Sequence, residues 1–198
     1  MLSTPLPGQD TALTPSHTAL AGLALCEAAG LPRAGLVAAL KRFRGLPHRV
    51  EKVAERADGV TYYDDSKGTN VGATVAALNG ALRPVVLIAG GEGKAQDFAP
   101  LASAVKAHAR AVVLIGKDRP AIAAALAGTG VEVIAAPSMA EAVLAAFEHA
   151  LHGDHVYLSP ACASFDMFRN YPHRAEVFRA AVHMLADEAG TMLEGEAG

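Results

Sequence analysis

The chain has 198 residues, of which 52% are hydrophobic and 19% charged, and a formal net charge of -3. This composition excludes a wholly disordered chain and provides no basic surface for nucleic acid or an anionic membrane. The apolar runs are too short to cross a bilayer, no signal peptide is evident, and two cysteines cannot build a disulfide framework, so we expect a soluble cytoplasmic protein.

The N-terminal part differs in composition from the rest of the chain. A proline-rich stretch precedes His17, from which a helical pattern begins. Pro32 starts a second helix, and Gly45 lies where the helical pattern ends. We therefore expect a tail with two helices over residues 1–44 and a separate domain over residues 45–198.

Short apolar runs then alternate with helical patterns of about ten to fifteen residues, which is typical of βαβ units and a mostly parallel sheet. Asp58-Gly59 separates the first two runs and predicts a tight hairpin turn. The later runs are apolar throughout, as expected when helices cover both faces of a sheet. The predicted fold is a Rossmann-like, doubly wound α/β domain with about six strands, preceded by the short helical segment. The expected strands cover residues 50–57, 60–64, 85–89, 111–115, 131–134 and 155–159.

The loop over residues 64–70 (DDSKGTN) lies between an expected strand and an expected helix. A helix start attracts anions because its backbone N–H groups and its dipole point toward them. Lys67 could add a charge for phosphate or carboxylate, and Asp65 could bind a ribose hydroxyl or a water on a cation. The alternative is that Asn70 only caps the helix and Lys67 is a solvated surface lysine.

The loop over residues 90–94 (GGEGK) resembles a nucleotide-binding loop only superficially. A Walker A motif requires G-x-x-x-x-G-K-S/T, whereas Ala95 follows Lys94 here. A glycine-rich loop after a strand is common in this class of fold, so this signal is weak alone.

The loop over residues 159–171 is rich in small residues that allow close approach of the backbone. Ser164 and the N–H groups around it could hold a carboxylate at the start of the next helix. Alternatively Ser164 only caps that helix, with Phe165 and Phe168 in the core. The local pattern favours a core position for both phenylalanines.

Two further features, a histidine repeat and a cysteine, resemble functional sites, but neither predicts one. His149, His152 and His155 recur every three residues, but a helix should end among them, so we expect their rings to fan out and predict no metal site. Cys162 has no predicted base beside it, which favours a buried or half-buried thiol over a nucleophile.

Taken together, DSKGTN, GGEGK and SPACASFDMFRNYPHRAEVF, with GLPHRVE before the hairpin, resemble the C-terminal domain of the Mur ligases. The resemblance runs from about His17 to Val182. The DSK-x-TN form is that of the type that adds D-glutamate to UDP-N-acetylmuramoyl-L-alanine in peptidoglycan synthesis, using ATP and Mg²⁺ and an acyl-phosphate intermediate.

The resemblance also implies site residues. Tyr171 stands where the family usually has phenylalanine, a change that keeps the aromatic ring. In the roles carried over by motif, Lys67 is catalytic, D-glutamate binds to Thr69, Lys94, Ser164, Phe165 and Tyr171, and the nucleotide faces Arg49, Asp65 and Lys67.

The family's Walker A loop and magnesium ligands belong to parts that this sequence lacks. We therefore expect a fragment in which residues 1–44 are a remnant of the central domain, inactive alone, with neither ATP nor Mg²⁺ bound. One alternative is an amino-acid- or nucleotide-binding α/β module without chemistry. Another is an unrelated doubly wound protein of the flavodoxin or methyltransferase type.

Overall fold

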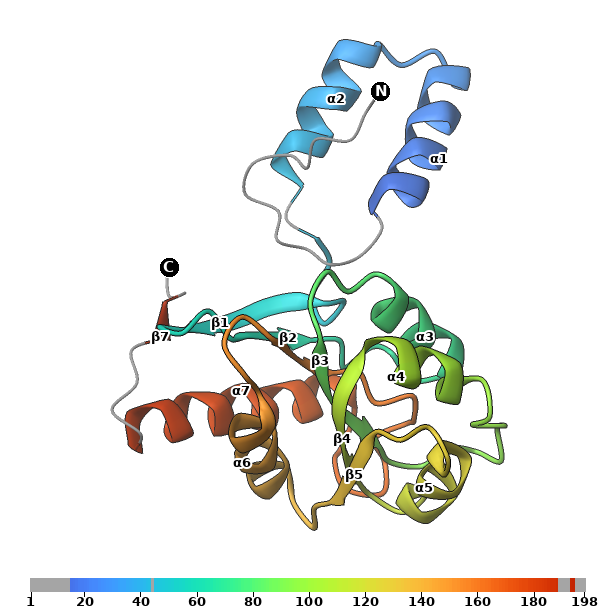
Figure 1. The fold of residues 1–198 in the computed structure, drawn as a ribbon. Helices are drawn as coiled ribbons and strands as arrows, with labels where there is room; N and C mark the ends of the chain where they lie inside the picture. The colour runs from blue at the N-terminus through green and yellow to red at the C-terminus, as the bar shows by residue number, and fades with distance from the viewer. Residues whose placement is uncertain (1–14, 44, 189–192, 195–198) are drawn as a thin grey trace.

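The computed structural model describes residues 15–43, 45–188 and 193–194 (Figure 1). The tail expected before residue 15 lies outside these residues. The described part consists of one twisted sheet with helices on both faces and a separate pair of helices at its N-terminal end. No helix within it is long and apolar enough to cross a membrane.

The strands confirm the prediction of a mostly parallel sheet. In the described part of the chain the order is β5-β4-β3-β6-β2-β1-β7, with parallel pairing from β5 through β2 and antiparallel pairing of β1 with β2 and β7. All six expected strands form, and β7 is an additional strand of two residues. Their bounds are β1 Glu51–Arg56, β2 Thr61–Asp64, β3 Val85–Gly90, β4 Ala109–Ile115, β5 Glu132–Ala135, β6 His155–Leu158 and β7 Leu193–Glu194.

The helices follow local signals in the sequence. Asn70 and Ser138 cap helices as their side chains accept hydrogen bonds from the backbone N–H groups of Ala73 and Glu141. The last helix begins at Tyr171, not at Ala175, because the fixed φ of a proline is tolerated in a first helical turn. The bounds are α1 Pro15–Ala28, α2 Arg33–Arg42, α3 Val71–Asn79, α4 Leu101–His108, α5 Arg119–Leu126, α6 Met139–His149 and α7 Tyr171–Glu188.

The hairpin between β1 and β2 confirms the prediction from Asp58-Gly59. Gly59 adopts a φ of 80°, which a side chain would oppose, and its N–H donates to the carbonyl of Arg56. The Arg56 N–H in turn donates to the carbonyl of Val60 at 2.8 Å. The turn places the start of β1 beside the end of β2, so Glu51 pairs with Asp64.

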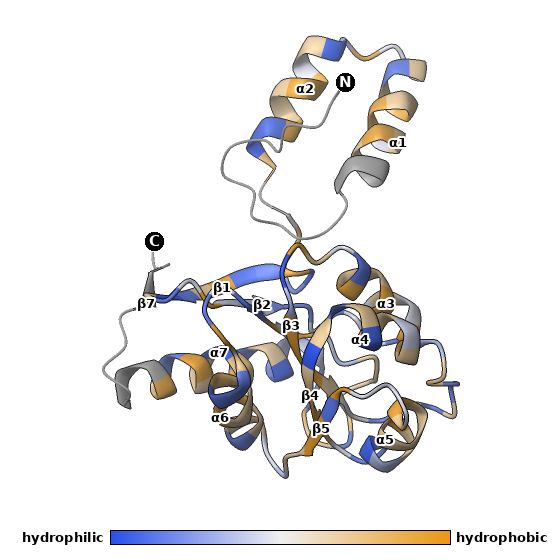
Figure 2. Cartoon of the chain, viewed as in Figure 1, coloured by the Kyte–Doolittle hydropathy of each residue, from blue (hydrophilic) through white to orange (hydrophobic). Residues whose placement is uncertain are grey.

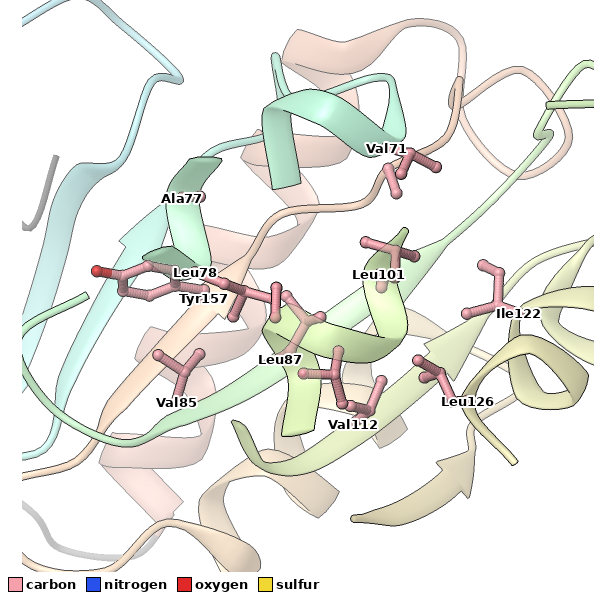
Figure 3. Packing of buried hydrophobic residues seen from close by; sticks show 14 of the residues in the cluster. Val71, Ala77, Leu78, Val85, Leu87, Leu101, Val112, Ile122, Leu126 and Tyr157 are labelled. Carbon is pink, nitrogen blue, oxygen red and sulfur yellow. The ribbon is translucent and has the colours of Figure 1, made fainter. Parts of the chain in front are cut away.

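Successive residues of the central strands point to opposite faces of the sheet, which gives two apolar layers. Leu87 packs under α3, α4 and α5, as Figure 3 shows, whereas Val86 and Ile88 pack against α6 and α7. Figure 2 shows hydrophobic residues in the central strands and hydrophilic bands along the outer sides of the helices. The doubly wound architecture follows from this burial on both faces.

Helices α1 and α2 lie beside each other and away from the sheet (Figure 1). Gly30, with a φ of 82°, ends α1 in a Schellman motif: its N–H donates to the carbonyl of Glu27, and that of Leu31 donates to Cys26. Leu20 and Leu25 are exposed, and α2 contains no buried residue. The division of the chain near residue 45 stays a prediction.

We expect Leu87→Ala to lower the free energy of unfolding by about 3 kcal/mol, because it removes a buried side chain from the layer under α3 and α4 and leaves a cavity. Urea denaturation followed by circular dichroism measures this loss. Leu82→Ala is the control, since that leucine is 76% exposed and its truncation should change stability by less than about 0.5 kcal/mol. Equal losses in the two variants would contradict the assigned core.

Candidate functional site

Three of the loops singled out in the sequence meet at one edge of the sheet. Strands β2, β6 and β3 are neighbours and run parallel, so the loops that follow them leave from the same C-terminal edge. The segment before β1 joins them because β1 runs antiparallel to β2. The candidate site consists of these four segments, residues 45–50, 65–70, 91–97 and 159–170.

Backbone hydrogen bonds join the loops after β3 and β6. The Gly90 N–H donates to the carbonyl of Pro160 at 2.8 Å, and Glu92 and Ala163 exchange two hydrogen bonds of 3.0 and 2.9 Å. A Cβ on Gly91 would lie 2.2 Å from the carbonyl oxygen of Ala163. The close approach therefore requires glycine at this position.

Gln96 connects three segments, and the sequence analysis gave it no role. Its side-chain Oε1 accepts a hydrogen bond of 3.0 Å from the N–H of Val71, the first residue of α3. Its Nε2 donates to the carbonyl of Ala161 at 2.7 Å. No local signal could have identified Gln96, because both of its partners are distant in the sequence.

Arg174 is a second residue without an assigned role in the sequence. It is fully buried and donates three hydrogen bonds: from Nε to Ser66 Oγ, from Nη2 to the Ser66 carbonyl and from Nη1 to the Cys162 carbonyl. Ser66 Oγ donates in turn to the carbonyl of Tyr171. The loops after β2 and β6 are thus joined through one guanidinium group.

The residues expected to face a nucleotide lie together. The Lys67 N–H donates to the carbonyl of His48 at 3.1 Å, which holds the segment containing Arg49 against the loop after β2. Lys67 is half-buried, and its Nζ lies 3.9 Å from the centroid of the Tyr171 ring. The cap by Asn70 is confirmed, whereas the alternative of a fully solvated Lys67 is wrong.

Asp65 is more enclosed than the sequence suggested. Its Oδ2 accepts a hydrogen bond of 2.6 Å from Ser159 Oγ, and its carboxylate also accepts one from the N–H of Val50. Burial raises the pKa of this carboxyl from 3.8 to about 6, against the opposing effect of the two hydrogen bonds. The carboxylate therefore ties the loop to β6 and to the segment before β1.

The backbone of the loop after β2 is not open to an anion over most of its length. The N–H groups of Ser66, Lys67 and Gly68 donate to Asp64, His48 and Asp65 respectively. The loop uses these three N–H groups internally, and the expected attraction of an anion to the start of α3 stays a prediction. The positive charge here belongs to the side chains of Arg49 and Lys67.

Lys94 occupies a strained turn. Lys94 and Ala95 adopt φ angles of 53° and 58°, and the Gln96 N–H donates to the carbonyl of Gly93 at 3.1 Å. These are the features of a type I′ turn, which ordinarily carries asparagine or glycine at its central positions. The turn exposes Lys94 and brings its Nζ to 5.8 Å from the centroid of the Phe165 ring.

The loop after β6 corrects the prediction for Phe165. This ring is 64% exposed, so the expected core position is wrong, whereas Phe168 packs against the core as predicted. The physical reason is a turn in which the Ser164 carbonyl accepts hydrogen bonds from the N–H groups of Met167 and Phe168. Ser164 begins this turn and does not cap α7, whose first turn is capped by the Asn170 side chain on the N–H of His173.

The start of that turn provides unpaired donors. Among the described residues, none accepts a hydrogen bond from the N–H groups of Ser164, Phe165 or Asp166, or from the Ser164 hydroxyl. Three successive N–H groups at the start of a turn can converge on one anion. This group of donors, beside Lys94, is the part of the edge suited to a carboxylate.

Thr69 and Tyr171 lie apart from that group. Tyr171 contacts Lys67 and packs edge-on against His48, and Thr69 donates its N–H to the carbonyl of Lys67. The residues expected to bind D-glutamate thus fall into two groups, one around Lys94 and one around Lys67. Their common role stays a prediction.

One cluster has the composition of a metal site. Within the described residues, His48, Glu51 and Asp64 are the only such group, with ligand atoms within 4.8 Å of one another. However, Arg179 Nη2 lies 2.6 Å from Glu51 and 3.2 Å from Asp64, so a guanidinium already neutralises both carboxylates. These residues do not fit a magnesium site.

The remaining candidates are His149 and Cys162. His149 Nδ1 lies 2.7 Å from the carbonyl oxygen of Ala145, within its own helix. Cys162 is fully buried, and burial raises the pKa of its thiol to about 12. The prediction of a buried thiol is confirmed.

Comparison with known proteins identifies the class to which this fold and edge belong. The sequence profile of the family described as "Mur ligase, glutamate ligase domain" matches residues 48–162. The chain therefore belongs to the Mur ligase family. The alternative of an unrelated doubly wound protein is wrong.

Among named relatives, the chain is 58% identical over 194 residues to the UDP-N-acetylmuramoylalanine–D-glutamate ligase of Nitrosospira multiformis, covering 96% of this chain and 41% of that protein. The fold matches the UDP-N-acetylmuramate-alanine ligase of Thermotoga maritima with a TM-score of 0.63 and 19% identity, over 86% of this chain and 38% of that one. It also matches the bifunctional folylpolyglutamate synthase/dihydrofolate synthase of Yersinia pestis, solved with AMPPNP and Mn, with a TM-score of 0.54 and 20% identity, over 96% and 42% of the two chains. The chain thus spans less than half of each of these proteins.

The strain at Ala95 can be tested directly. We expect Ala95→Gly to raise the free energy of unfolding by about 1 kcal/mol, because glycine adopts a positive φ without steric cost and the exposed methyl group packs on nothing buried. The matched control is Ala76→Gly, in the exposed interior of α3, which should lower stability by about 1 kcal/mol. Urea denaturation measures both, and a loss of stability in both variants would refute the strained turn.

The raised pKa of Asp65 predicts a pH dependence of stability. The folded chain holds this proton up to about pH 6 and the unfolded chain only to about pH 4, so the contribution of Asp65 to stability should fall as the pH rises between these values. The measurement is the difference in unfolding free energy between the wild-type chain and Asp65→Asn from pH 4 to pH 8. The wild-type chain should lose stability relative to Asp65→Asn as the pH rises from about 4 to 6. If it keeps or gains stability relative to the variant, the raised pKa is contradicted.

Proposed function

We propose that this chain is the part of a D-glutamate-adding Mur ligase that binds D-glutamate and completes the ATP site. The observation that carries the proposal is the arrangement at the C-terminal edge. Lys67 and Lys94 lie on the loops after β2 and β3, the two strands that flank β6, and the unpaired donors of residues 164–166 lie beside Lys94. The 58% identity to a ligase of this name supports the choice of reaction.

The group around Lys94 suits a dicarboxylate. Lys94 is a mobile point charge for one carboxylate, and the Ser164 hydroxyl with its neighbouring N–H groups is a neutral, preformed cradle for the other. The exposed ring of Phe165 provides an apolar wall beside Lys94. We assign Thr69 and Tyr171 to the side of the amino acid that faces Lys67, and the preference for the D form is part of the proposal.

The group around Lys67 suits phosphate. In the proposed reaction a carboxylate oxygen of UDP-N-acetylmuramoyl-L-alanine attacks the γ-phosphorus of ATP and ADP leaves. The amine of D-glutamate then attacks the acyl carbon, loses a proton and expels inorganic phosphate. Lys67, fixed against Tyr171, would neutralise charge on the transferring phosphoryl group, and Arg49 would contact the nucleotide from the segment before β1.

Magnesium would add to this neutralisation in the whole enzyme. The group of His48, Glu51 and Asp64 does not fit the ion, because Arg179 already occupies its carboxylates. These three residues therefore have no role in the proposed reaction. Because the chain spans 41% of the Nitrosospira multiformis ligase, we propose that it catalyses nothing alone.

A chimera tests the proposal. In it, this chain replaces the matching 194-residue segment of the Nitrosospira multiformis enzyme. We expect D-glutamate-dependent release of phosphate from ATP in the presence of UDP-N-acetylmuramoyl-L-alanine, and none with L-glutamate. Activity with neither form, while the chain itself shows D-glutamate binding by amide NMR, would instead favour a binding module without chemistry.

Substitutions in the chimera separate the two groups. Lys94→Ala and Ser164→Ala should each raise the KM for D-glutamate on the order of 10-fold, because each removes a hydrogen bond to a charged group worth about 1–3 kcal/mol. Lys67→Ala should mainly lower kcat. Lys106→Ala, an exposed lysine in the last turn of α4, is the matched control and should change neither constant. An unchanged KM in Lys94→Ala and Ser164→Ala would refute the assigned D-glutamate site.

A further inference from the structure

The buried guanidinium of Arg174 holds two loops next to their candidate ligand residues. Two of its hydrogen bonds, of 3.0 and 2.8 Å, go to Ser66, the residue directly before Lys67. The third, of 3.1 Å, goes to the carbonyl of Cys162, in the loop that carries Ser164. Arg174 therefore acts on both loops at once without reaching the surface.

The contact between Lys67 and Tyr171 depends on the same group. Ser66 Oγ accepts from Arg174 Nε and donates to the Tyr171 carbonyl at 2.8 Å. One hydroxyl thus fixes the residue before Lys67 and the first residue of α7 relative to each other. The distance of 3.9 Å between Lys67 Nζ and the Tyr171 ring follows from this chain of bonds.

Arg174 is the only fully buried arginine in the described part of the chain. Its guanidinium has no carboxylate within ion-pair distance there, and all three of its acceptors are neutral. Burying a charge without a counter-ion is unfavourable, and an apolar side chain of similar volume would fill the same space at lower cost. Two half-buried arginines form ion pairs, Arg56 with Asp58 and Arg179 with Glu51 and Asp64. A third, Arg119, donates to the carbonyl of Ala136.

Arg174 instead fixes the relative positions of the loops after β2 and β6. A planar guanidinium with donors in fixed directions can bond a hydroxyl and two carbonyls on separate loops, whereas a lysine ammonium cannot reproduce that fork. Asp64, Asp65 and Asp166 act on it through space, and burial lowers its pKa to about 10, so the group remains charged at neutral pH.

From these contacts we propose that Arg174 is a positioning residue, which aligns Lys67 with Tyr171 and holds the loops after β2 and β6 in the register needed for both substrates. The catalytic consequence rests on the function proposed above. The alignment itself is a property of the chain and does not depend on that function.

The alignment is tested in the isolated 198-residue chain. The ring current of Tyr171 shifts the NMR resonances of the Lys67 ε-methylene, and we expect Arg174→Lys and Arg174→Met to lose at least half of that shift. Their amide at Lys67, which donates to the carbonyl of His48, should also exchange faster with solvent. Val113→Ala, a core substitution in β4 on the face under α6, lowers stability without touching either loop and should keep the shift. A preserved shift in Arg174→Lys would overturn the alignment.

The catalytic consequence is tested in the chimera. Arg174→Lys should raise the KM for both ATP and D-glutamate at least 5-fold, because one group serves both loops. In Val113→Ala, a smaller folded fraction lowers the apparent kcat and leaves both KM values unchanged. If Arg174→Lys changes kcat alone, its role is only structural and the proposal fails. An inactive unmodified chimera counts against the proposed function, and the NMR measurement then still decides the alignment.

Discussion

Parallel pairing of β2, β6 and β3 is the constraint on which the rest of the edge depends. It brings three loops into one small region, where each must satisfy its backbone polar groups with little help from water. The loops do this largely with one another: Gly90 with Pro160, and Glu92 with Ala163. The edge is consequently a single interlocked body rather than a set of independent loops.

This interlocking is accompanied by backbone strain that is concentrated at the edge. In the part of the chain that the structure describes, the residues other than glycine with positive φ are His48, Val50, Lys94, Ala95 and Ala161. All of them lie in the segments at the C-terminal edge, and a positive φ in a β-branched residue such as Val50 is rare. Strain of this kind persists only where surrounding contacts over-determine the conformation, and it gathers at functional sites. The side chains of Gln96 and Arg174 supply such contacts.

Much of the fold could be predicted because its determinants are local. The alternation of apolar runs gave all six longer strands, and Asp58-Gly59 and Asn70 act within a few residues of their own positions. Phe165 was misjudged because its exposure depends on the turn started by Ser164, which the helical pattern does not reveal. Gln96 and Arg174 could not be predicted, since their partners are set by the packing of loops that lie far apart in the sequence.

The difference between local and distant determinants also explains which site residues the motifs identify. Roles for Lys67, Lys94 and Ser164 came from the motifs on which the family resemblance rests. The residues that hold this edge in shape face inward, and their chemistry is ordinary: an amide in Gln96 and a guanidinium in Arg174. The motifs therefore assign roles to the groups suited to touching a ligand and none to those that aim them, although Arg174 lies within the last motif.

The backbone hydrogen bonds between the loops after β3 and β6 affect which residues of this edge can change in evolution. The bonds that join Gly90 to Pro160 and Glu92 to Ala163 use main-chain atoms, which nearly every amino acid possesses. Mutation can therefore exchange the exposed side chains, such as Lys94 and Phe165, while the frame beneath them persists. An edge built in this way can diversify in what it recognises without having to fold anew.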